Sequence, residues 1–133
     1  MRPIKLNKDG SIPKKNKMGN TKITFEGVTY DSKWEAHLAL LLKADLKPGH
    51  KLRYHVPIKL VDKFEKNGKK YRAIWYEADF ILFNENGAYR VIDAKGHETE
   101  VFKIKRKLFE MKYPELTIEV IKYDKRKHGK LFF

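Results

Sequence analysis

The chain has 133 residues, a formal net charge of +13 and no cysteine. One hydrophobic core fits this length, while disulfides and thiolate metal sites are excluded. No apolar run approaches the length of a membrane span or a signal-peptide core, so a soluble, intracellular protein is expected. A chain this basic is expected to bind a polyanion, most commonly nucleic acid.

The basic charge is concentrated at the amino terminus. Residues 1–22 contain seven Lys and Arg and one Asp, a net charge of +6, together with Pro and Gly and no apolar periodicity. This composition predicts a flexible basic arm over residues 1–20, in which Lys14, Lys15 and Lys17 would contact phosphates. A solubilising tail with no dedicated role is the alternative interpretation.

The apolar patterning and the turn residues predict one folded domain over residues 21–124, followed by a basic carboxy-terminal tail over residues 125–133. In chain order the predicted elements are a hairpin at Ile23–Tyr30, a helix at Lys33–Ala44, strands at Leu52–Val61, Tyr71–Phe83 and Ala88–Lys95, a helix at Val101–Lys112 and a strand at Leu116–Tyr123. The last helix crosses between two strands, which favours a parallel pairing on that side of the sheet. We therefore expect an α/β fold with a mixed sheet flanked by helices, in the order (β-hairpin)-α-β-β-β-α-β.

Two of the predicted strands each carry an aspartate in apolar surroundings. Asp79 interrupts an apolar strand, and Asp93 follows Val91-Ile92 and precedes Lys95 by two residues. If Glu85-Asn86-Gly87 forms a three-residue hairpin loop, Asp79 falls directly opposite Asp93. Two carboxylates and one ammonium would then share a small patch, which suits a divalent metal such as Mg²⁺ or Mn²⁺ and a water to be activated.

Other interpretations of this patch stay open. Asp79 and Lys95 could form a plain ion pair, because a carboxylate in buried surroundings needs a partner of some kind. A strand end that emerges into solvent also commonly carries Asp, Lys and Gly. Glu77 lies on the same predicted face as Asp79 and could be the ligand in its place.

A third acid lies in the first predicted helix. By the 3.6-residue period, Glu35 borders the apolar stripe formed by Trp34, Leu38 and Leu42. Ser32 lies three residues before it, and Ser-x-x-Glu is also the pattern of a helix capping box. The residues alone therefore favour a capping role, and a role near a metal needs further support.

The second predicted helix combines an apolar face with a basic one. Its predicted buried face consists of Val101, Phe102, Ile104, Leu108, Phe109 and Met111. Lys103, Arg106 and Lys107 occupy much of the remainder and could follow a phosphate backbone near the strand ends. An ordinary solvated face is the alternative.

The five histidines show no metal-ligand spacing such as His-x-x-x-His. His97, two residues past Lys95, is a further candidate for contact with the scissile region. The chain has no Gly-rich phosphate loop and no nucleophile elbow, which argues against nucleotide hydrolases and serine hydrolases. Metal-dependent phosphodiester chemistry is the function that the residues favour.

Taken in order, these features resemble the PD-(D/E)XK nuclease superfamily, and more closely a small group of nuclease-like proteins encoded by bacteriophages and prophages. The resemblance runs from about Phe25 to Lys122 and rests on Ser32-Lys33-Trp34-Glu35-Ala36, Tyr76-Glu77-Ala78-Asp79-Phe80 and Val91-Ile92-Asp93-Ala94-Lys95-Gly96. Ala78 stands where the superfamily name has proline. Asp93 replaces the commoner glutamate, which shortens the ligand and keeps its chemistry.

The resemblance implies a restriction-endonuclease-like core and a Mg²⁺- or Mn²⁺-dependent endonuclease that hydrolyses DNA. Asp79, Asp93 and the backbone carbonyl of Ala94 would hold the metal, and Lys95 would be the catalytic lysine. Glu35 would take the place of the first-helix glutamate that many members use near the metal.

The resemblance also suggests a setting for this activity. Phage members of the superfamily commonly act in recombination, replication or packaging, so branched DNA in the host cytoplasm is an expected substrate. A homodimer would suit symmetric cuts, which need two sites. Two alternatives stay open, a non-catalytic nucleic-acid-binding module on the same fold and a basic phage structural or packaging accessory.

Overall fold

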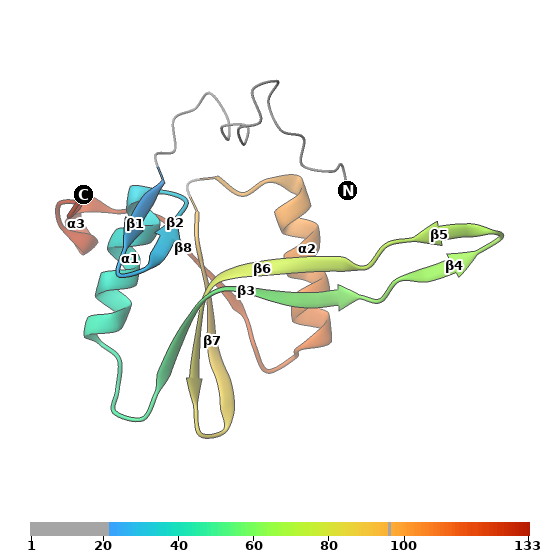
Figure 1. Cartoon of the computed structure of the whole chain (residues 1–133), viewed down its shortest axis with the longest axis horizontal. Coiled ribbons are helices and arrows are strands. Elements are labelled where there is room, and N and C mark those ends of the chain that lie inside the picture. The colour runs from blue at the N-terminus through green and yellow to red at the C-terminus, as the bar shows by residue number, and fades with distance from the viewer. Residues whose placement is uncertain (1–21, 96) are drawn as a thin grey trace.

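The computed structural model describes residues 22–95 and 97–133, and the predicted arm over residues 1–20 lies outside them. The elements in chain order are β1 (Ile23–Phe25), β2 (Val28–Tyr30), α1 (Lys33–Ala44), β3 (Lys51–Val61), β4 (Phe64–Lys66), β5 (Lys69–Tyr71), β6 (Ile74–Asn84), β7 (Gly87–Ala94), α2 (Glu100–Lys112), β8 (Ile118–Ile121) and α3 (Lys125–His128) (Figure 1). In the described part of the chain, no helix is long and apolar enough to cross a membrane.

A four-stranded sheet in the order β3-β6-β7-β8 forms the centre of the fold. Its first three strands pair antiparallel, and β7 pairs with β8 in parallel after the chain has crossed over through α2. The parallel pairing expected from the crossover helix is therefore present. The fold is α/β, with a mixed sheet flanked by helices, as the sequence predicts.

Helices α1 and α2 cover opposite faces of this sheet, so the described residues form two apolar clusters. Neighbouring residues of β7 point to different clusters, because side chains alternate along a strand. Ile92 packs with Trp34 of α1, whereas Val91 packs with Phe102 and Phe109 of α2. In Figure 1 the two helices accordingly lie on either side of β7.

The predicted buried face of α2 is only partly correct. Phe102 and Phe109 are buried, but Val101, Ile104 and Met111 are 60 to 73% exposed. Two aromatic rings seven residues apart bury more apolar area than the aliphatic side chains do. They therefore decide which side of the helix faces the sheet.

The β3–β6 hairpin changes the face that it presents halfway along its length. Leu52 and Tyr54 of β3 pack with the α1 cluster, whereas Val56 and Ile58 pack with the α2 cluster. Strand alternation alone would place all four side chains on one face. His55, between the two pairs, has a left-handed backbone with a φ of 49°. A left-handed residue inside a strand acts like a bulge, which increases the twist and redirects the side chains.

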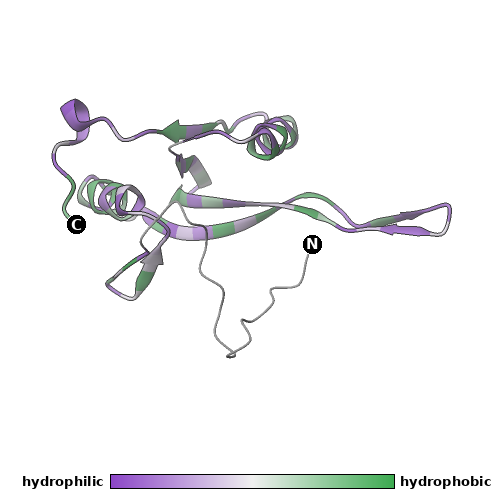
Figure 2. Ribbon diagram, turned by 90° about the horizontal axis from the view of Figure 1, so that it is seen from above, coloured by the Kyte–Doolittle hydropathy of each residue, from purple (hydrophilic) through white to green (hydrophobic). Residues whose placement is uncertain are grey.

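Beyond the sheet, the chain between β3 and β6 continues as a narrow two-stranded ribbon. The strand predicted from Tyr71 begins at Ile74, and the segment between β3 and β6 forms a separate hairpin of β4 and β5. Asn67 and Gly68 at its tip both have positive φ, as a type I′ turn requires. Figures 1 and 2 show this hairpin extending past α2.

The carboxy-terminal segment folds back over α1. His37 of α1 is buried, and its Nε2 is 2.9 Å from the carbonyl oxygen of His128. Its Nδ1 accepts a 3.2 Å hydrogen bond from the backbone N–H of Phe132, so Nε2 carries the proton. Both ring nitrogens are thus used to hold the segment, and His37 has a structural role.

Candidate active site

The hairpin between β6 and β7 sets the position of the two aspartates. Its loop has two residues instead of the predicted three, and an irregularity farther along the ladder compensates for the difference. The ladder ends with Phe80 paired to Ile92, so Asp79 and Asp93 are the next residues on facing strands. There the N–H of Ala94 donates a 2.8 Å hydrogen bond to Oδ2 of Asp79. The Asp79 side chain thus acts as the acceptor for this N–H at the strand end.

Asp93 is almost completely buried, with 2% of its surface exposed. The Tyr76 hydroxyl donates a 2.8 Å hydrogen bond to its Oδ2, and burial together with the charge of Asp93 raises the pKa of Tyr76. Oδ1 lies 3.3 Å from Nζ of Lys95 but makes no hydrogen bond within the described residues. We regard this contact as a charge pair without hydrogen-bond geometry. A buried carboxylate oxygen in this state is costly and is available to a cation.

Asp79 is half-buried and lies close to two other acids. Burial, followed by the charges of Glu35 and Asp93, raises the pKa of Asp79 to about 8. The Ala94 N–H and the Lys95 ammonium act in the opposite direction and do not offset these effects. Glu35, Asp79 and Asp93, here called the carboxylate cluster, thus cannot all ionise at low cost without an added positive charge.

Glu35 takes part in the start of α1 and also faces the aspartates. The hydroxyl of Ser32, the N-cap, accepts a 3.1 Å hydrogen bond from the N–H of Glu35. The Glu35 carboxylate in turn accepts a 3.3 Å hydrogen bond from the N–H of Asp31 rather than from Ser32, so the predicted capping box is only half formed. Burial raises the pKa of Glu35 despite its hydrogen bond with His55. Since its charge acts on Asp79, Glu35 combines helix capping with a place in the cluster.

His55 is a residue of this site that the sequence analysis did not single out. Its Nε2 lies 2.6 Å from Oε1 of Glu35, and the ladder register places it opposite Asp79. Asp31, Glu35 and His55 offer ligand atoms that all lie within 4.8 Å of one another. Glu35 thus belongs to a possible metal-donor set with His55 and Asp31, and its charge also acts on Asp79.

Two cations from neighbouring elements meet at the ring of Phe102. Nζ of Lys95 lies 4.6 Å from the ring centroid, and the guanidinium carbon of Arg106 lies 5.3 Å from it. Arg106 also forms an ion pair with Glu98. Of the basic residues predicted on α2, Arg106 therefore lies beside the predicted catalytic lysine.

The other two basic residues predicted on α2 lie on its exposed surface. Lys103 pairs with Glu100 at 3.2 Å on the surface of α2, and Lys107 is exposed. Lys14, Lys15 and Lys17 lie outside the described residues, as does Gly96 of the predicted motif.

Two further candidates from the sequence are exposed. Glu77, the alternative to Asp79, lies in solvent, while the acids that raise the pKa of Asp79 are Glu35 and Asp93. His97 is also exposed. The geometry therefore favours Asp79 over Glu77 as the member of the cluster on β6.

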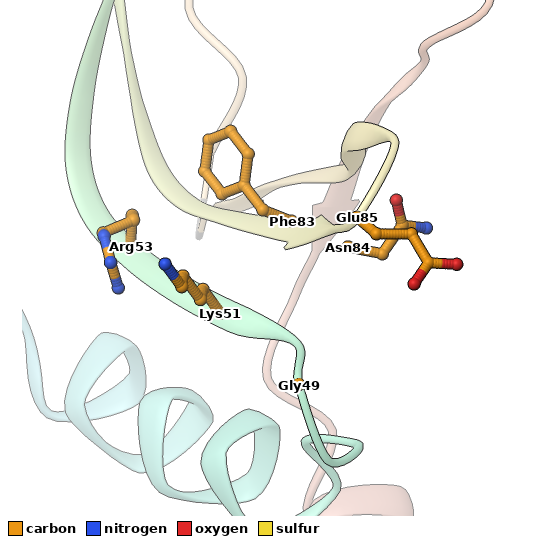
Figure 3. A pocket seen from close by; sticks show the side chains of 6 residues that line it. All are labelled: Gly49, Lys51, Arg53, Phe83, Asn84 and Glu85. Carbon is orange, nitrogen blue, oxygen red and sulfur yellow. The ribbon is translucent and has the colours of Figure 1, made fainter.

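A hollow of about 410 Å³ lies at the other end of β3 and β6, beside the loop to β7. It is lined by Gly49, Lys51, Arg53, Phe83, Asn84 and Glu85. Figure 3 shows Lys51 and Arg53 following each other along β3, beside Phe83. None of the lining residues belongs to the carboxylate cluster, so the hollow and the cluster are separate features.

Residues 15–128 match the family model described as "Protein of unknown function (DUF1064)". The chain belongs to this family. The DUF1064 match includes every member of the carboxylate cluster, together with Lys95 and His55. No curated protein and no solved structure matches the chain. The case for a function therefore depends on the geometry of the cluster.

Proposed function

We propose that this DUF1064 protein is a metal-dependent endodeoxyribonuclease with a restriction-endonuclease-like core of the PD-(D/E)XK superfamily. Asp79 and Asp93 lie on facing strand ends with Lys95 beside Asp93, and the charge of Glu35 acts on Asp79. This arrangement is the observation that carries the proposal. The order of the elements, with a parallel last strand after a crossover helix, agrees with such a core. An origin in a phage or prophage is part of the same proposal.

The donor groups fit a divalent cation. Oδ1 of Asp93 is buried and makes no hydrogen bond within the described residues. The pKa of Asp79 is raised by burial and, to a smaller extent, by the charges of the neighbouring acids. Carboxylate oxygens are the ligands that Mg²⁺ and Mn²⁺ prefer. Asp79 and Asp93 would hold the metal together with the carbonyl of Ala94, and Glu35 would lie beside it. A cation bound there supplies a Lewis acid for the phosphate and lowers the pKa of a bound water.

The protein's own groups have separate tasks in such a reaction. Lys95 places a positive charge beside the carboxylates, where it can stabilise the negative charge that develops on the phosphate. Tyr76 and the N–H of Ala94 fix the two aspartates, since each donates a 2.8 Å hydrogen bond to one of them. His55 holds Glu35 in the same way. The site is thus oriented by groups that need not touch the substrate.

A non-catalytic nucleic-acid-binding module is the second candidate, and one observation favours it. Oδ2 of Asp93 already accepts the Tyr76 hydroxyl, and Oδ1 already faces Lys95. An ion-pair cluster that only stabilises the fold would have the same contacts. Both candidates predict salt-sensitive DNA binding, so binding alone does not separate them.

Cleavage assays separate the two candidates. Labelled linear duplex, single strand, flap and four-way junction would be incubated with Mg²⁺, Mn²⁺ or EDTA. We expect metal-dependent cutting that falls by at least about 100-fold in Asp93→Asn and in Lys95→Ala, with DNA binding retained. Glu77→Gln, which changes an exposed acid on the same strand as Asp79, is the matched control and should cut normally. Tight binding without cutting of any substrate would favour the binding module instead.

The choice among the four substrates would also test the expected setting. Preference for the junction would agree with a homodimer, because two symmetric cuts need two sites. Sedimentation of the protein with and without that junction would measure the oligomeric state directly.

A further inference from the structure

The β4–β5 hairpin is the least buried part of the described fold. All six residues of its two strands are exposed, and neither helix covers them. Figure 2 shows it as a narrow extension with a hydrophilic tip, well away from both helices. An isolated two-stranded hairpin is at best marginally stable in water, so an exposed one suggests a binding partner.

One face of this hairpin carries two matched cross-strand pairs. The rings of Phe64 and Tyr71 stack with centroids 4.6 Å apart and an angle of 10° between their planes. Lys66 and Lys69 form the next pair towards the tip, and strand alternation places them on the same face as the rings. Nζ of Lys69 also lies 5.0 Å from the centroid of the Tyr71 ring.

The paired lysines cost stability unless an anion lies near them. Like charges directly opposite each other on a two-stranded ribbon repel, whereas Glu65 and Lys70 on the other face form an opposite-charge pair. Within the described residues, no carboxylate forms an ion pair with Lys66 or Lys69. The arrangement therefore indicates an anionic partner on the face with the aromatic rings.

The excess of positive charge continues from the hairpin to the sheet. The residues from 59 to 75 contain six Lys and Arg and two Asp and Glu. At the inner end of this segment, Nζ of Lys59 lies 5.3 Å from the ring of Trp75, which is 46% exposed. A basic track interleaved with aromatic rings thus leads from the tip of the hairpin towards the sheet.

We propose that the β4–β5 hairpin is an arm that lies in a groove of duplex DNA while the carboxylate cluster is placed against the backbone. That this duplex DNA is also the substrate of the enzyme rests on the proposed function. A two-stranded ribbon fits the major groove, which is about 12 Å wide. The two rings stack on each other, which leaves each of them at most one face for a base of a single strand, and Lys69 lies over the Tyr71 ring.

The length of the arm agrees with this placement. Eleven residues separate His55 at the site from Lys66 near the tip, which spans at most about 36 Å of extended chain. One turn of duplex DNA measures about 34 Å along its axis. The arm would therefore contact the groove about one helical turn from the scissile phosphate.

The test is DNA binding by a charge-reversed arm, Lys66→Glu with Lys69→Glu. The affinity for a labelled 30-base-pair duplex would be measured by fluorescence anisotropy in EDTA over a series of salt concentrations. We expect at least a tenfold loss of affinity and a salt slope reduced by about 2, since each phosphate contact contributes about 0.9. Lys47→Glu with Lys125→Glu makes the same change in net charge on exposed residues elsewhere and should have a smaller effect.

Each other outcome of this test has a defined meaning. An arm variant that binds duplex as well as the charge control would overturn the proposal, as would a loss confined to single-stranded DNA. A change in oligomeric state without a loss of DNA affinity would also overturn it, because the arm would then join two copies of the chain. Arm-dependent duplex binding by a wild type that cuts no substrate would support the arm and contradict the nuclease. Melting curves check that both variants remain folded.

Discussion

Tyr76 is the residue on which the position of Asp93 depends. Its hydroxyl holds one carboxylate oxygen of Asp93 and leaves the other facing the site. We expect Tyr76→Phe to lower metal affinity or cleavage rate by roughly 10- to 100-fold, as for other groups that orient metal ligands. Calorimetric titration with Mn²⁺ and cleavage rates would measure the two quantities.

Tyr113→Phe is the matched control for this change. The Tyr113 ring also packs against Phe109, and its hydroxyl makes no hydrogen bond within the described residues. Its variant should bind metal and cleave DNA like the wild type. Wild-type Mn²⁺ affinity in Tyr76→Phe would show that the hydroxyl does not orient Asp93 for a cation.

Asp79 gives a prediction about stability and pH. Its pKa in the folded protein is about 8, above the ordinary value of 3.8, so the folded state holds an extra proton between these values. Stability from this group is therefore full below about pH 3.8, and it is lost progressively as the pH rises from there to about 8. In EDTA, Asp79→Asn should raise the free energy of unfolding more near pH 8.5 than near pH 5, by about 1 to 2 kcal/mol.

Urea unfolding of both proteins at the two pH values would measure this difference. The Asn side chain can still accept the N–H of Ala94, so the substitution removes the charge and keeps the hydrogen bond. A gain of equal size at both pH values would contradict the assigned cause. Loss of cutting together with higher stability would be the usual exchange between function and stability at a charged site.

At the scale of elements, the bend of β3 at His55 joins the two halves of the sheet. A side chain with a left-handed backbone costs about 1 to 2 kcal/mol, and glycine avoids this cost. His55→Ala should therefore be less stable than His55→Gly by about 1 kcal/mol, although alanine is normally the better strand residue. Thermal unfolding of the two variants would measure the difference, and greater stability of the alanine variant would contradict it.

The bounds of α1 could be predicted from the sequence because the signals are local. Ser32 caps the helix, and the apolar stripe continues to Leu42, so the predicted range Lys33–Ala44 is the observed one. The positions of Asp79 and Asp93 at facing strand ends could be predicted because they depend on one hairpin loop, which a Gly turn signal marks in the sequence. The loop differs by one residue, but the compensating irregularity keeps the predicted partners.

The place of His55 could not be predicted in this way. If the register of the β4–β5 hairpin continued inward, His55 would pair with Phe80. An irregularity between Lys59 and Val61 shifts the ladder by one residue, and Asp79 takes that place. A bulge leaves no clear local signal, and a shift of one residue moves every side chain to the other face. The prediction of the buried face of α2 was only partly correct because it too depends on tertiary structure. Packing against the sheet decides which of two apolar stripes on the helix is buried.

For the molecule as a whole, the carboxylate cluster lies where the two apolar clusters meet. Glu35 comes from the half of the fold that packs around α1, and Tyr76, which holds Asp93, belongs to the half that packs around α2. A cation bound between these carboxylates would link both halves. Metal binding should therefore stabilise the complete fold and raise the temperature of a single unfolding transition, rather than stabilise one element alone.

This linkage is testable without any nuclease assay. At one hundred times its dissociation constant, Mg²⁺ or Mn²⁺ should raise the free energy of unfolding by about 2.7 kcal/mol, which corresponds to a melting-temperature increase on the order of 10 °C. Asp79→Asn with Asp93→Asn should lose this increase, whereas Glu77→Gln should keep it. The same increase in the double variant would place the cation elsewhere, and Asp31, Glu35 and His55 would then be the donors to substitute next. Differential scanning calorimetry with and without EDTA measures the transition, and its cooperativity shows whether both halves unfold together.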